Sequence, residues 1–396
     1  MKISKQNKKA KKIFIITSIS ITAILFIGAV GAYLLLHSYI SKINLVNKVG
    51  KDTSAIVSDS LEDEVDITLD EDSDVEADDS LDDEALTEAA IMDEFSSVSS
   101  GEYNLVRSRA FMKEETYDKN VQNNLDITNL MDDKNVTNIL LIGSDTREEN
   151  DRGRSDSMIV ITINNNTKQI IATSFLRDIY LNIPGKENNR LNVAYASGGA
   201  ERLMETLQQN FKFKINKYIM VDFFAFIDIV DAIGGINIEV KAGDLDTINS
   251  LIRGTNRLLG ENPESDALAK SGLQLLNGKQ ALSYSRNRST RNGDFDRTEK
   301  QREVLMAIYE KVKKLNILQM NDLLNAILPQ ITSNFSEKEI LSLILKMPAY
   351  LDYSSTEWSV PVAGSYENVY IRGMAVLNID FDQNIREIHQ RLYQVE

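Results

Sequence analysis

An uncharged run near the N-terminus constrains this chain more than any other feature. The run extends from Ile13 to Leu36, "IFIITSISITAILFIGAVGAYLLL", and contains no Asp, Glu, Lys or Arg. A helix of this length is roughly 36 Å long, enough to cross a hydrocarbon core of about 30 Å with some tilt. Six lysines precede it, and a basic flank of this kind stays in the cytoplasm. We therefore predict a cytoplasmic tail at 1–12, one transmembrane anchor at 13–36 and an extracellular remainder.

A cleaved signal peptide is the alternative interpretation of this run. "AVG" at 29–31 resembles a weak cleavage site. The apolar core of a signal peptide is usually about 7–15 residues long, which is shorter than the run seen here. The length therefore favours an uncleaved anchor.

A strongly acidic segment follows. Residues 52–100 hold 19 Asp and Glu and no Lys or Arg. Such a segment buries too little apolar surface to offset its chain entropy, and its like charges repel, so we predict that 52–100 is disordered. With the juxtamembrane residues before it, this acidic segment forms a spacer over 37–100. Without those acids and the nine lysines before residue 52, 35 basic and 40 acidic side chains remain in 101–396. The outer domain is thus close to neutral and open to an anion site.

The supply of reactive side chains limits the chemistry. The chain has no cysteine and two histidines, His37 and His389. Disulfides, thiolate metal sites and a cysteine nucleophile are therefore excluded. With only two histidines, a Ser-His-Asp triad or a zinc site with several histidines is disfavoured. An enzyme built on this chain would use carboxylates, arginines and a hard metal ion.

Strand and helix patterns alternate along residues 101–396. Short runs rich in Ile and Val at 135–143, 157–164 and 169–175 predict strands that are buried on both faces. This alternation predicts one α/β domain, with three α/β/α layers around a mostly buried central sheet. Further helices are expected at 198–211, 223–235, 296–318, 320–328, 336–347 and 382–394, further strands at 236–240, 356–361 and 375–379, and a short helix followed by an extended piece at 276–288.

Two aspartates stand at neighbouring strand ends. Asp145 follows the first predicted strand, and Asp156 directly precedes the second. A hairpin would bring them together, and Mg²⁺ favours one or two carboxylates with waters and phosphate oxygens. Aspartate is also a common turn residue, so turn chemistry remains an alternative.

Arginines follow the third predicted strand. Arg177 precedes Asp178, and Arg190 and Asn192 come after a Pro-Gly turn. The alternative is a local ion pair, which contributes little to the stability of the fold when it is exposed to solvent. No GxGxxG or Walker pattern is present, so a nucleotide site has no support.

Five arginines cluster in "SYSRNRSTRNGDFDRTEKQRE", residues 283–303. If 283–288 is extended, Arg286 and Arg288 lie on the same side, because strand side chains repeat every two residues. Arg291 and Arg302 are interpreted as solvent-facing.

The same stretch contains a predicted helix start. If Asp294 or Asp296 caps that helix, Arg297 lies in its first turn, with Gln301 one turn further on the same face. Helix N-termini favour anions, and guanidinium groups bind phosphate oxygens in pairs. A diphosphate with Mg²⁺ would suit this arrangement. Surface ion pairs remain an alternative, whereas nucleic acid is disfavoured, because the domain is slightly acidic, extracellular and without a nucleic-acid motif.

Six motifs in order resemble the LytR–CpsA–Psr family. They fall within about 135–310 of an outer domain at 101–396, and they read "NILLIGSDTR", "RSDSMIVITIN", "SFLRDIYLNIPG", "RLNVAYASGG", "VDFFAFIDIVDAIGGINIEV" and "LNGKQALSYSRNR…GDFDRTEKQREVL". The anchor followed by an outer domain also resembles the family. This chain has Arg190 and Val193 where many members have Lys and His. Relative to shorter members it also has an insertion at 241–268, which either shapes the choice of polymer or acceptor or forms a surface helix.

The resemblance implies a Mg²⁺-dependent phosphotransferase, with Mn²⁺ as a possible substitute. It would move a glycopolymer, such as teichoic acid or capsule, from a polyprenyl diphosphate to peptidoglycan. By motif, the metal carboxylates would be Asp145 and Asp156, and Asp294 and Arg297 would be catalytic. The diphosphate contacts would be Arg177, Arg190, Arg286, Arg288, Arg297 and Gln301. A diphosphate hydrolase and a non-catalytic envelope sensor or transcriptional attenuator are the alternatives.

Overall fold

The computed structural model describes residues 42–45, 114–125, 129–144, 155–288, 294–316, 319–320, 323–325 and 328–395. The predicted tail and anchor, and the acidic residues 52–100, lie outside these ranges. Within them, no helix is long and apolar enough to cross a membrane.

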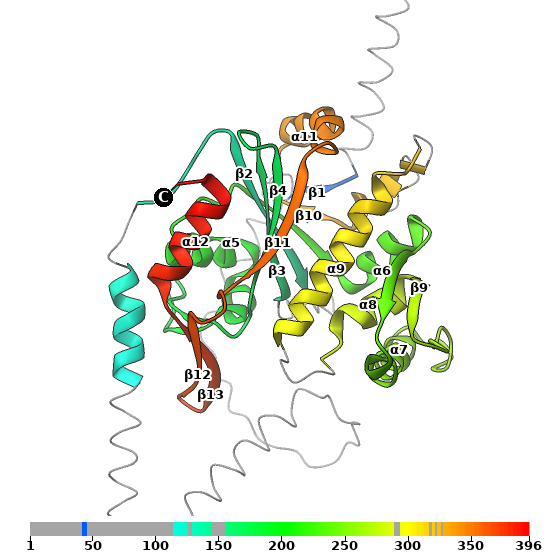
Figure 1. Ribbon diagram of the computed structural model, residues 1–396, viewed down its shortest axis with the longest axis horizontal. Helices are drawn as coiled ribbons and strands as arrows, with labels where there is room; N and C mark the ends of the chain where they lie inside the picture. The colour runs from blue at the N-terminus through cyan, green and yellow to red at the C-terminus, as the bar shows by residue number, and fades with distance from the viewer. Residues whose placement is uncertain are drawn as a thin grey trace, which may run out of the picture.

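A seven-stranded mixed sheet forms the centre of the domain, in the order β1-β10-β7-β2-β3-β4-β11 (Figure 1). The antiparallel neighbours are β2 with β3, β3 with β4, and β7 with β10, whereas the other three pairs are parallel. The strands predicted from the Ile- and Val-rich runs are confirmed. The bounds of the strands are β1 Asn44–Leu45, β2 Val136–Ser144, β3 Ser155–Asn164, β4 Gln169–Phe175, β7 Lys217–Asp222, β10 Thr332–Ser333 and β11 Ser354–Val360.

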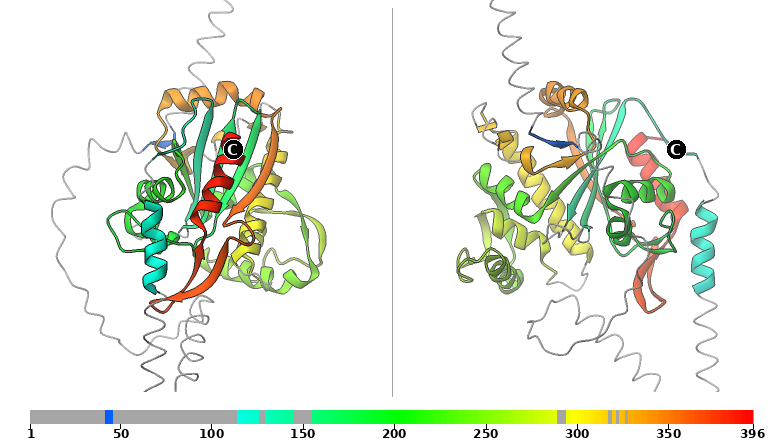
Figure 2. Two further views of the ribbon diagram at one scale, coloured as in Figure 1. Left: turned by 60° about the vertical axis from the view of Figure 1, so that its left-hand side comes forward. Right: turned by 180° about the vertical axis from the view of Figure 1, so that it is seen from behind.

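Helices cover both faces of this sheet, as Figures 1 and 2 show. On one face lie α5 (Leu191–Phe211) and α12 (Phe381–Tyr393), over a core to which Leu140, Val160 and Phe175 contribute. On the other side lie α6 (Phe223–Ala232), α8 (Gly278–Arg286), α9 (Asp294–Val312) and α11 (Glu337–Tyr350). The predicted α/β class with helices on both sides is confirmed.

A second, smaller core joins α6, α8 and α9 to the ribbon of β8 (Ile236–Val240) and β9 (Gly272–Leu276). The insertion 241–268 belongs to this core. It forms a short 3-10 helix, Ala242–Asp244, followed by α7 (Leu245–Leu258), and its Ile248, Ile252 and Leu268 are buried. The insertion is therefore a packed part of the fold rather than a helix lying loosely on the surface.

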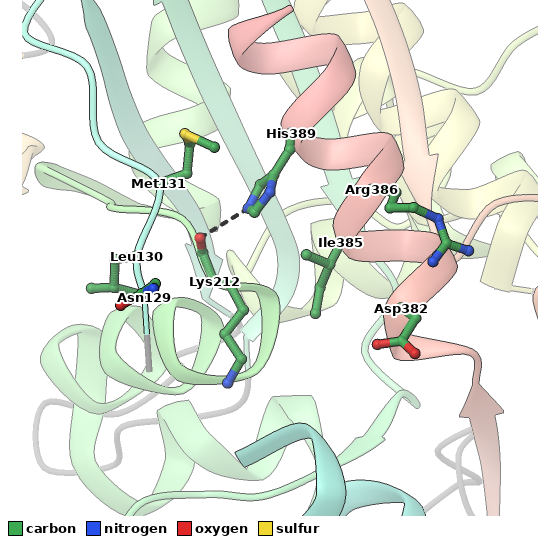
Figure 3. Close-up of a pocket in the computed structure, with 8 residues that line it drawn as sticks. All are labelled: Asn129, Leu130, Met131, Lys212, Asp382, Ile385, Arg386 and His389. Carbon is green, nitrogen blue, oxygen red and sulfur yellow. Dashed lines mark hydrogen bonds between the residues drawn. The ribbon is translucent and has the colours of Figure 1, made fainter. Parts of the chain in front are cut away.

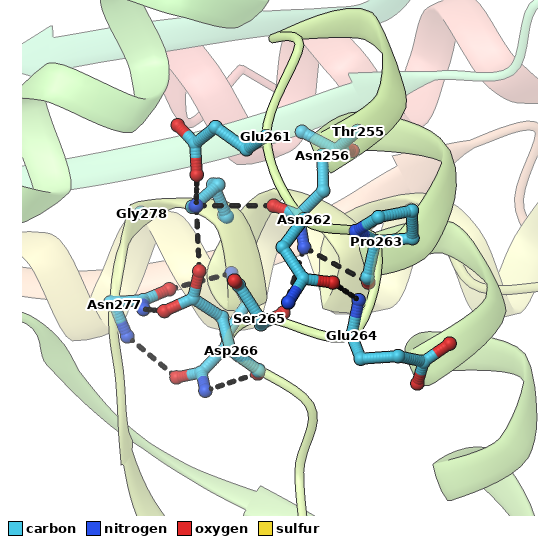
Figure 4. A network of polar contacts seen from close by, with 12 residues as sticks. Thr255, Asn256, Glu261, Asn262, Pro263, Glu264, Ser265, Asp266, Asn277 and Gly278 are labelled. Atoms are coloured by element: carbon cyan, nitrogen blue, oxygen red, sulfur yellow. Dashed lines mark hydrogen bonds and ion pairs between the residues drawn. The ribbon is translucent and has the colours of Figure 1, made fainter.

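A polar network closes the end of the insertion against α8 (Figure 4). Lys279 Nζ lies 2.6 Å from carboxylate oxygens of both Glu261 and Asp266, and it donates to Asn256 Oδ1 at 3.1 Å. Asn277 Nδ2 donates to the other oxygen of Asp266 at 2.8 Å. These contacts tie the turn after α7 to the first residues of α8, and hence to the arginines at the other end of α8.

The conformation of residues 283–288 differs from the prediction. Ser283–Arg286 is the end of helix α8, not an extended strand. The helix starts at a capping box in which the Asn277 side chain and Gln280 satisfy each other's backbone N–H groups. The short helix predicted at the start of 276–288 is therefore confirmed, but it extends further than predicted, to Arg286.

Smaller elements complete the domain. The sheet includes Asn44–Leu45, from the segment that the sequence assigns to the juxtamembrane spacer, and the helix at 114–125 buries Val121 in the main core. Three short elements are β5 (Tyr180–Leu181), β6 (Asn189–Arg190) and a 3-10 turn at Leu328–Gln330. The hairpin β12 (Tyr366–Ile371) and β13 (Met374–Ile379) precedes α12, and β12 escaped prediction because most of its side chains are exposed or half-buried.

We predict that Gly278→Ala destabilises the domain by about 1–3 kcal/mol, the usual cost of overpacking a filled space. A Cβ at this position would lie 2.3 Å from the backbone oxygen of Ile227, so α6 and α8 would have to move apart. Urea unfolding measures the effect. Gly254→Ala is the matched control, because a Cβ there meets nothing within 4 Å and alanine favours the helix. Equal stabilities of the two variants would contradict the prediction.

Candidate active site

An ion pair joins the ends of two neighbouring strands. Asp156 is the second residue of β3, and Arg177 follows β4 by two positions. The two strands are antiparallel, so these ends lie at one edge of the sheet. Arg177 Nη1 donates to Asp156 Oδ1 at 3.1 Å, which confirms that these two predicted residues meet.

Helix α9 brings a second set of side chains to the same point. Arg297 Nη1 lies 3.7 Å from Asp156 Oδ1, and Gln301 Nε2 donates to the backbone oxygen of Asp156 at 3.4 Å. Asp294, in the first turn, lies 2.5 Å from Arg297 Nη2 and 3.4 Å from Arg177 Nε. As predicted, Arg297 and Gln301 share one face of the helix.

The Arg297 guanidinium is buried but not saturated. Its side chain is 3% exposed, yet Nε and Nη2 have no hydrogen-bond acceptor among the described residues. The short contact to Asp294 is therefore a charge contact without hydrogen-bond geometry. Arg177 Nε also has no hydrogen-bond acceptor, and neither Asp294 oxygen has a hydrogen-bond donor, among the described residues. Because a buried polar group without a partner is costly, the unpaired guanidinium nitrogens of Arg297 and Arg177 indicate a site that an oxygen-rich anion would complete.

Two more arginines approach from the end of α8. The Arg286 guanidinium carbon lies 4.8 Å from the centre of the Phe223 ring, a cation–π arrangement at the start of α6. Arg288, two residues after the helix, is exposed. These residues reach the site from a helix end and the residues after it, so the predicted strand alternation is not what aligns them.

The charges of this cluster act on its carboxylates. Burial would raise the pKa of Asp156, but the positive charges of Arg297, Arg177, Arg288 and Arg286 outweigh it and lower that pKa. The pKa of Arg288 falls to about 10, first through the loss of water around its guanidinium and then through Arg297 and Arg177. The Arg288 side chain is exposed, but its guanidinium lies near two other positive charges, and this crowding favours an added negative charge.

Asp178 behaves differently from Asp156. Burial, and then the charge of Asp294, raise the pKa of Asp178 above its usual value, while Arg177 and Arg190 act in the opposite direction. Arg190 is thus close enough to influence the cluster, and it immediately precedes α5. The buried Asn192 fixes the backbone of the segment after β4, because its backbone N–H donates to the Arg177 carbonyl at 3.2 Å.

Some predicted residues lie elsewhere or outside the described ranges. Asp145 and Arg291 are outside them. Arg302 was predicted to face solvent, and this is wrong: it is 8% exposed, with Nε 4.0 Å from Glu357 on β11. Helix α9 is covered by the sheet on one side and by the second core on the other, so few of its positions face water. No cluster of three or more potential metal ligands occurs among the described residues.

A buried ion pair beside the site had no signal in the sequence pattern. Lys300 Nζ lies 3.2 Å from Asp244 Oδ2, and both residues are almost fully buried. Asp244 ends the 3-10 helix of the insertion, and Lys300 lies one turn after Arg297 on α9. The insertion is therefore attached to the helix that carries the catalytic candidates.

Two pockets lie outside the arginine cluster. One, of about 340 Å³, is lined by His389, Arg386 and Asp382 of α12 and by Lys212 after α5 (Figure 3). His389 Nε2 is 3.0 Å from the Lys212 carbonyl. The second, of about 410 Å³, lies between β8 and α9 and includes Tyr284, whose hydroxyl bonds Glu303. Neither is lined by a predicted site residue.

Comparison with known proteins gives one consistent result. The model of the LytR_cpsA_psr family matches residues 102–391. The chain is 33% identical over 233 residues to Biofilm regulatory protein A of Streptococcus mutans, which covers 56% of this chain and 54% of that protein. It is 31% identical over 236 residues to the polyisoprenyl-teichoic acid–peptidoglycan teichoic acid transferase TagU of Enterococcus faecalis. This match covers 58% of this chain and 71% of that protein. The chain thus spans about half the length of the first relative.

Solved structures agree with these matches. A structure described as TagT bound to LI-WTA has a TM-score of 0.52 at 26% identity, covering 66% of this chain and 90% of that one. The crystal structure of B. subtilis TagT has a TM-score of 0.51 at 25% identity, and the match covers 68% of this chain and 94% of that one. The crystal structure of a Streptococcus agalactiae protein has a TM-score of 0.56 at 27% identity, and the match covers 65% of this chain and 87% of that one. The family resemblance seen in the motifs is confirmed.

We predict that Asp156→Asn lowers the free energy of unfolding by about 2 kcal/mol at neutral pH, because it leaves two arginines without their shared carboxylate. The folded pKa of Asp156 is lowered, so its contribution is present above the unfolded value of about 4 and is lost as the pH falls through the folded value. Urea unfolding between about pH 3 and pH 7 measures the difference. Asp352→Asn, at an exposed position, is the control. If the difference in unfolding free energy between the wild type and Asp156→Asn does not shrink in acid, the stabilising role assigned to the Asp156 carboxylate is contradicted.

Proposed function

This chain belongs to the LytR_cpsA_psr family, and we propose that it transfers a glycopolymer, such as teichoic acid or capsule, from a polyprenyl diphosphate to peptidoglycan. The proposal places the domain outside the cell, on a single anchor at 13–36 with a cytoplasmic tail at 1–12. The similarity to a relative named as a teichoic acid transferase and to a structure described as TagT bound to LI-WTA supports it.

The observation that carries this proposal is the unsaturated arginine cluster. Five arginines and three aspartates meet at one edge of the sheet, so a net positive charge remains for a ligand. The buried Arg297 keeps two guanidinium nitrogens without an acceptor. Guanidinium groups bind phosphate oxygens through paired charge-assisted hydrogen bonds, and a diphosphate presents several such oxygens. The diphosphate contacts would be Arg177, Arg190, Arg286, Arg288, Arg297 and Gln301.

The sheet supplies a place for the lipid chain. Leu141, Ile161 and Ile219 lie on central strands, yet they are only partly buried, whereas the residues on either side of Leu141 and Ile161, which point to the opposite face, are fully buried. Apolar side chains in the middle of a seven-stranded sheet are normally covered completely. Their partial exposure lies on the same side as α9, so a polyprenyl chain could lie along this face with its diphosphate at the arginines.

The chain's own residues suggest how transfer would proceed. A sugar hydroxyl of peptidoglycan attacks the phosphate that carries the polymer, and the bond from this phosphate to the lipid phosphate breaks. The arginines stabilise charge on the transferring group and on the leaving lipid phosphate. Asp294 is the candidate base: its Oδ1 is in charge contact with Arg297 and Arg177, whereas its Oδ2 has no hydrogen-bond donor among the described residues and could accept the hydroxyl proton.

A magnesium ion is compatible with this site. Mg²⁺ binds one or two carboxylates together with waters and phosphate oxygens, so Asp156 and the motif-matched Asp145 would hold it, with Mn²⁺ as a substitute. When bound, the ion would neutralise diphosphate oxygens. Asp156 Oδ1 already contacts two arginines, so the ligand phosphate would have to complete the coordination.

Hydrolysis and a non-catalytic sensor are the competing functions. A hydrolase would release lipid phosphate equally well without peptidoglycan, whereas a transferase would place the polymer covalently on it. A sensor that acts by protein contacts would bind neither lipid diphosphate nor metal. Mass spectrometry of the purified full chain, looking for co-purified polyprenyl phosphates, separates the sensor from both enzymes.

We predict that Arg288→Ala lowers transfer of lipid-linked polymer to peptidoglycan by about 10²-fold, the usual effect of removing one donor that stabilises developing charge. Arg288 is exposed, so folding should be unaffected. Arg253→Ala on α7 is the matched control, because Arg253 is a partly exposed arginine of the same domain, 3.8 Å from Glu264. Equal rates for the two variants would sink the diphosphate assignment.

The same assay tests Asp294. If Asp294 is the base, Asp294→Asn lowers the rate and removes the acidic limb of its pH profile. If it only holds Arg297, the variant keeps that limb and loses lipid affinity instead. The split between kcat and KM therefore decides its role.

We predict that Asp156→Asn weakens Mn²⁺ binding by roughly tenfold or more, measured on the full chain by electron paramagnetic resonance in the presence of inorganic diphosphate. Asp178→Asn is the control, since it removes the same charge from the same cluster without removing a proposed ligand. Equal weakening by both variants would show a general charge effect and would refute the metal assignment.

A further inference from the structure

Helix α11 presents an apolar outer surface that no described residue covers. Its inner side packs Ile340 and Leu343 against the sheet. Because side chains repeat every 3.6 residues along a helix, Leu341, Leu345 and Pro348 lie on the opposite side. Leu345 is 66% exposed and Pro348 is exposed, while Leu341 is half-buried. We call this surface, residues 338, 341, 345, 348 and 349, the α11 outer face.

The exposed charges on and beside the α11 outer face are two lysines: Lys338 lies on it and Lys346 beside it. Of the two acids in the first turn, Glu339 is turned aside, because it pairs with Lys217 at 2.8 Å and with the Ser336 cap. Glu337, which is half-buried, lies one turn before Leu341 at the N-terminal end of the same side. Exposed leucine and proline framed by lysines is the composition of helices that lie in the interface of a membrane.

The chain itself ties this helix to the proposed anchor. Ile43 is buried in one cluster with Leu328, and Ile340 of α11 packs against that cluster. The next two residues form β1, paired with β10 at the sheet edge. Figures 1 and 2 show β1 and α11 at the same end of the molecule. The described strand at 44–45 therefore enters the domain beside α11.

The available chain length limits how far α11 can be from the membrane. The proposed anchor ends at Leu36, and Lys42 already contacts Asn325 of the domain. Six residue steps span at most about 20 Å when fully extended. The acidic segment 52–100 comes after β1 in the chain, so it cannot lengthen this connection.

We propose that the α11 outer face lies on the lipid surface beside the anchor. The inference rests on the proposed anchor at 13–36. The apolar side chains enter the headgroup region while Lys338 and Lys346 contact lipid phosphates. The arginine cluster then points away from the membrane, because Asp156 and Ile163, which packs near α11, lie at opposite ends of β3, roughly 23 Å apart. The domain would hold its diphosphate site toward the cell wall while the lipid chain returns along the sheet toward the bilayer.

The absence of cysteine in the natural chain permits a direct test. Leu345→Cys and Tyr370→Cys are each labelled with a fluorophore in the full chain and reconstituted in vesicles of phosphatidylcholine and phosphatidylglycerol that contain a nitroxide-labelled lipid. Tyr370 is the matched control: it is 53% exposed, on the β12–β13 hairpin that meets the arginine end through Leu377 and Asp178. We expect several-fold stronger quenching at 345 than at 370. Equal quenching overturns the proposal.

A second variant separates lipid contact from mere proximity. Leu345→Glu, with the fluorophore at Ala349→Cys, should lose most of its quenching while its thermal unfolding stays unchanged, because position 345 is exposed. Unchanged quenching overturns the lipid contact, and disulfide-linked dimers of Leu345→Cys would show a second protein copy there instead. Extraction with alkaline carbonate tests the anchor alone. Protein that stays in the vesicles but shows equal quenching at both positions refutes the α11 contact and leaves the anchor standing.

Discussion

The carboxylate of Asp156 is the contact on which the arrangement of the site depends. It meets a guanidinium group from the end of β4 and another from α9. Arg297 is almost fully buried, and a buried cation is strongly destabilising unless a carboxylate offsets it. The position of Arg297 is thus coupled to the pairing of β3 with β4, and any shift of α9 along the sheet would separate these charges.

Two cores hold this contact from opposite sides. The main core fixes the strand ends that carry Asp156 and Arg177. The second core fixes α8 and α9, and the insertion adds to it the Lys279 network and the buried pair of Lys300 with Asp244. A long insertion that packs in this way is well placed to affect the approach of a polymer or an acceptor, because it is tied to α8 and α9, which carry three of the site's arginines and carboxylates.

Local patterns predicted local structure well and misplaced single side chains. Strands β2, β3 and β4 followed from continuous runs of branched apolar residues, which suit strands buried on both faces. The short helix expected at the start of 276–288 is present, but it continues to Arg286, so the extended conformation expected for 283–286 was wrong. Arg302 was misjudged because a charged residue on a helix usually faces water, whereas both sides of α9 are covered. The two-residue strand β1 is too short to leave any pattern.

The sequence by itself determined the class of fold, the order of the motifs and, through them, the family. These properties depend on residue type and local spacing, and both are written along the chain. Only the tertiary structure decided which charges meet. Arg177 and Arg297 are far apart in the sequence, and their common carboxylate depends on strand register and on the placement of α9. Such contacts arise from the packing of whole elements against two cores, which no local pattern records.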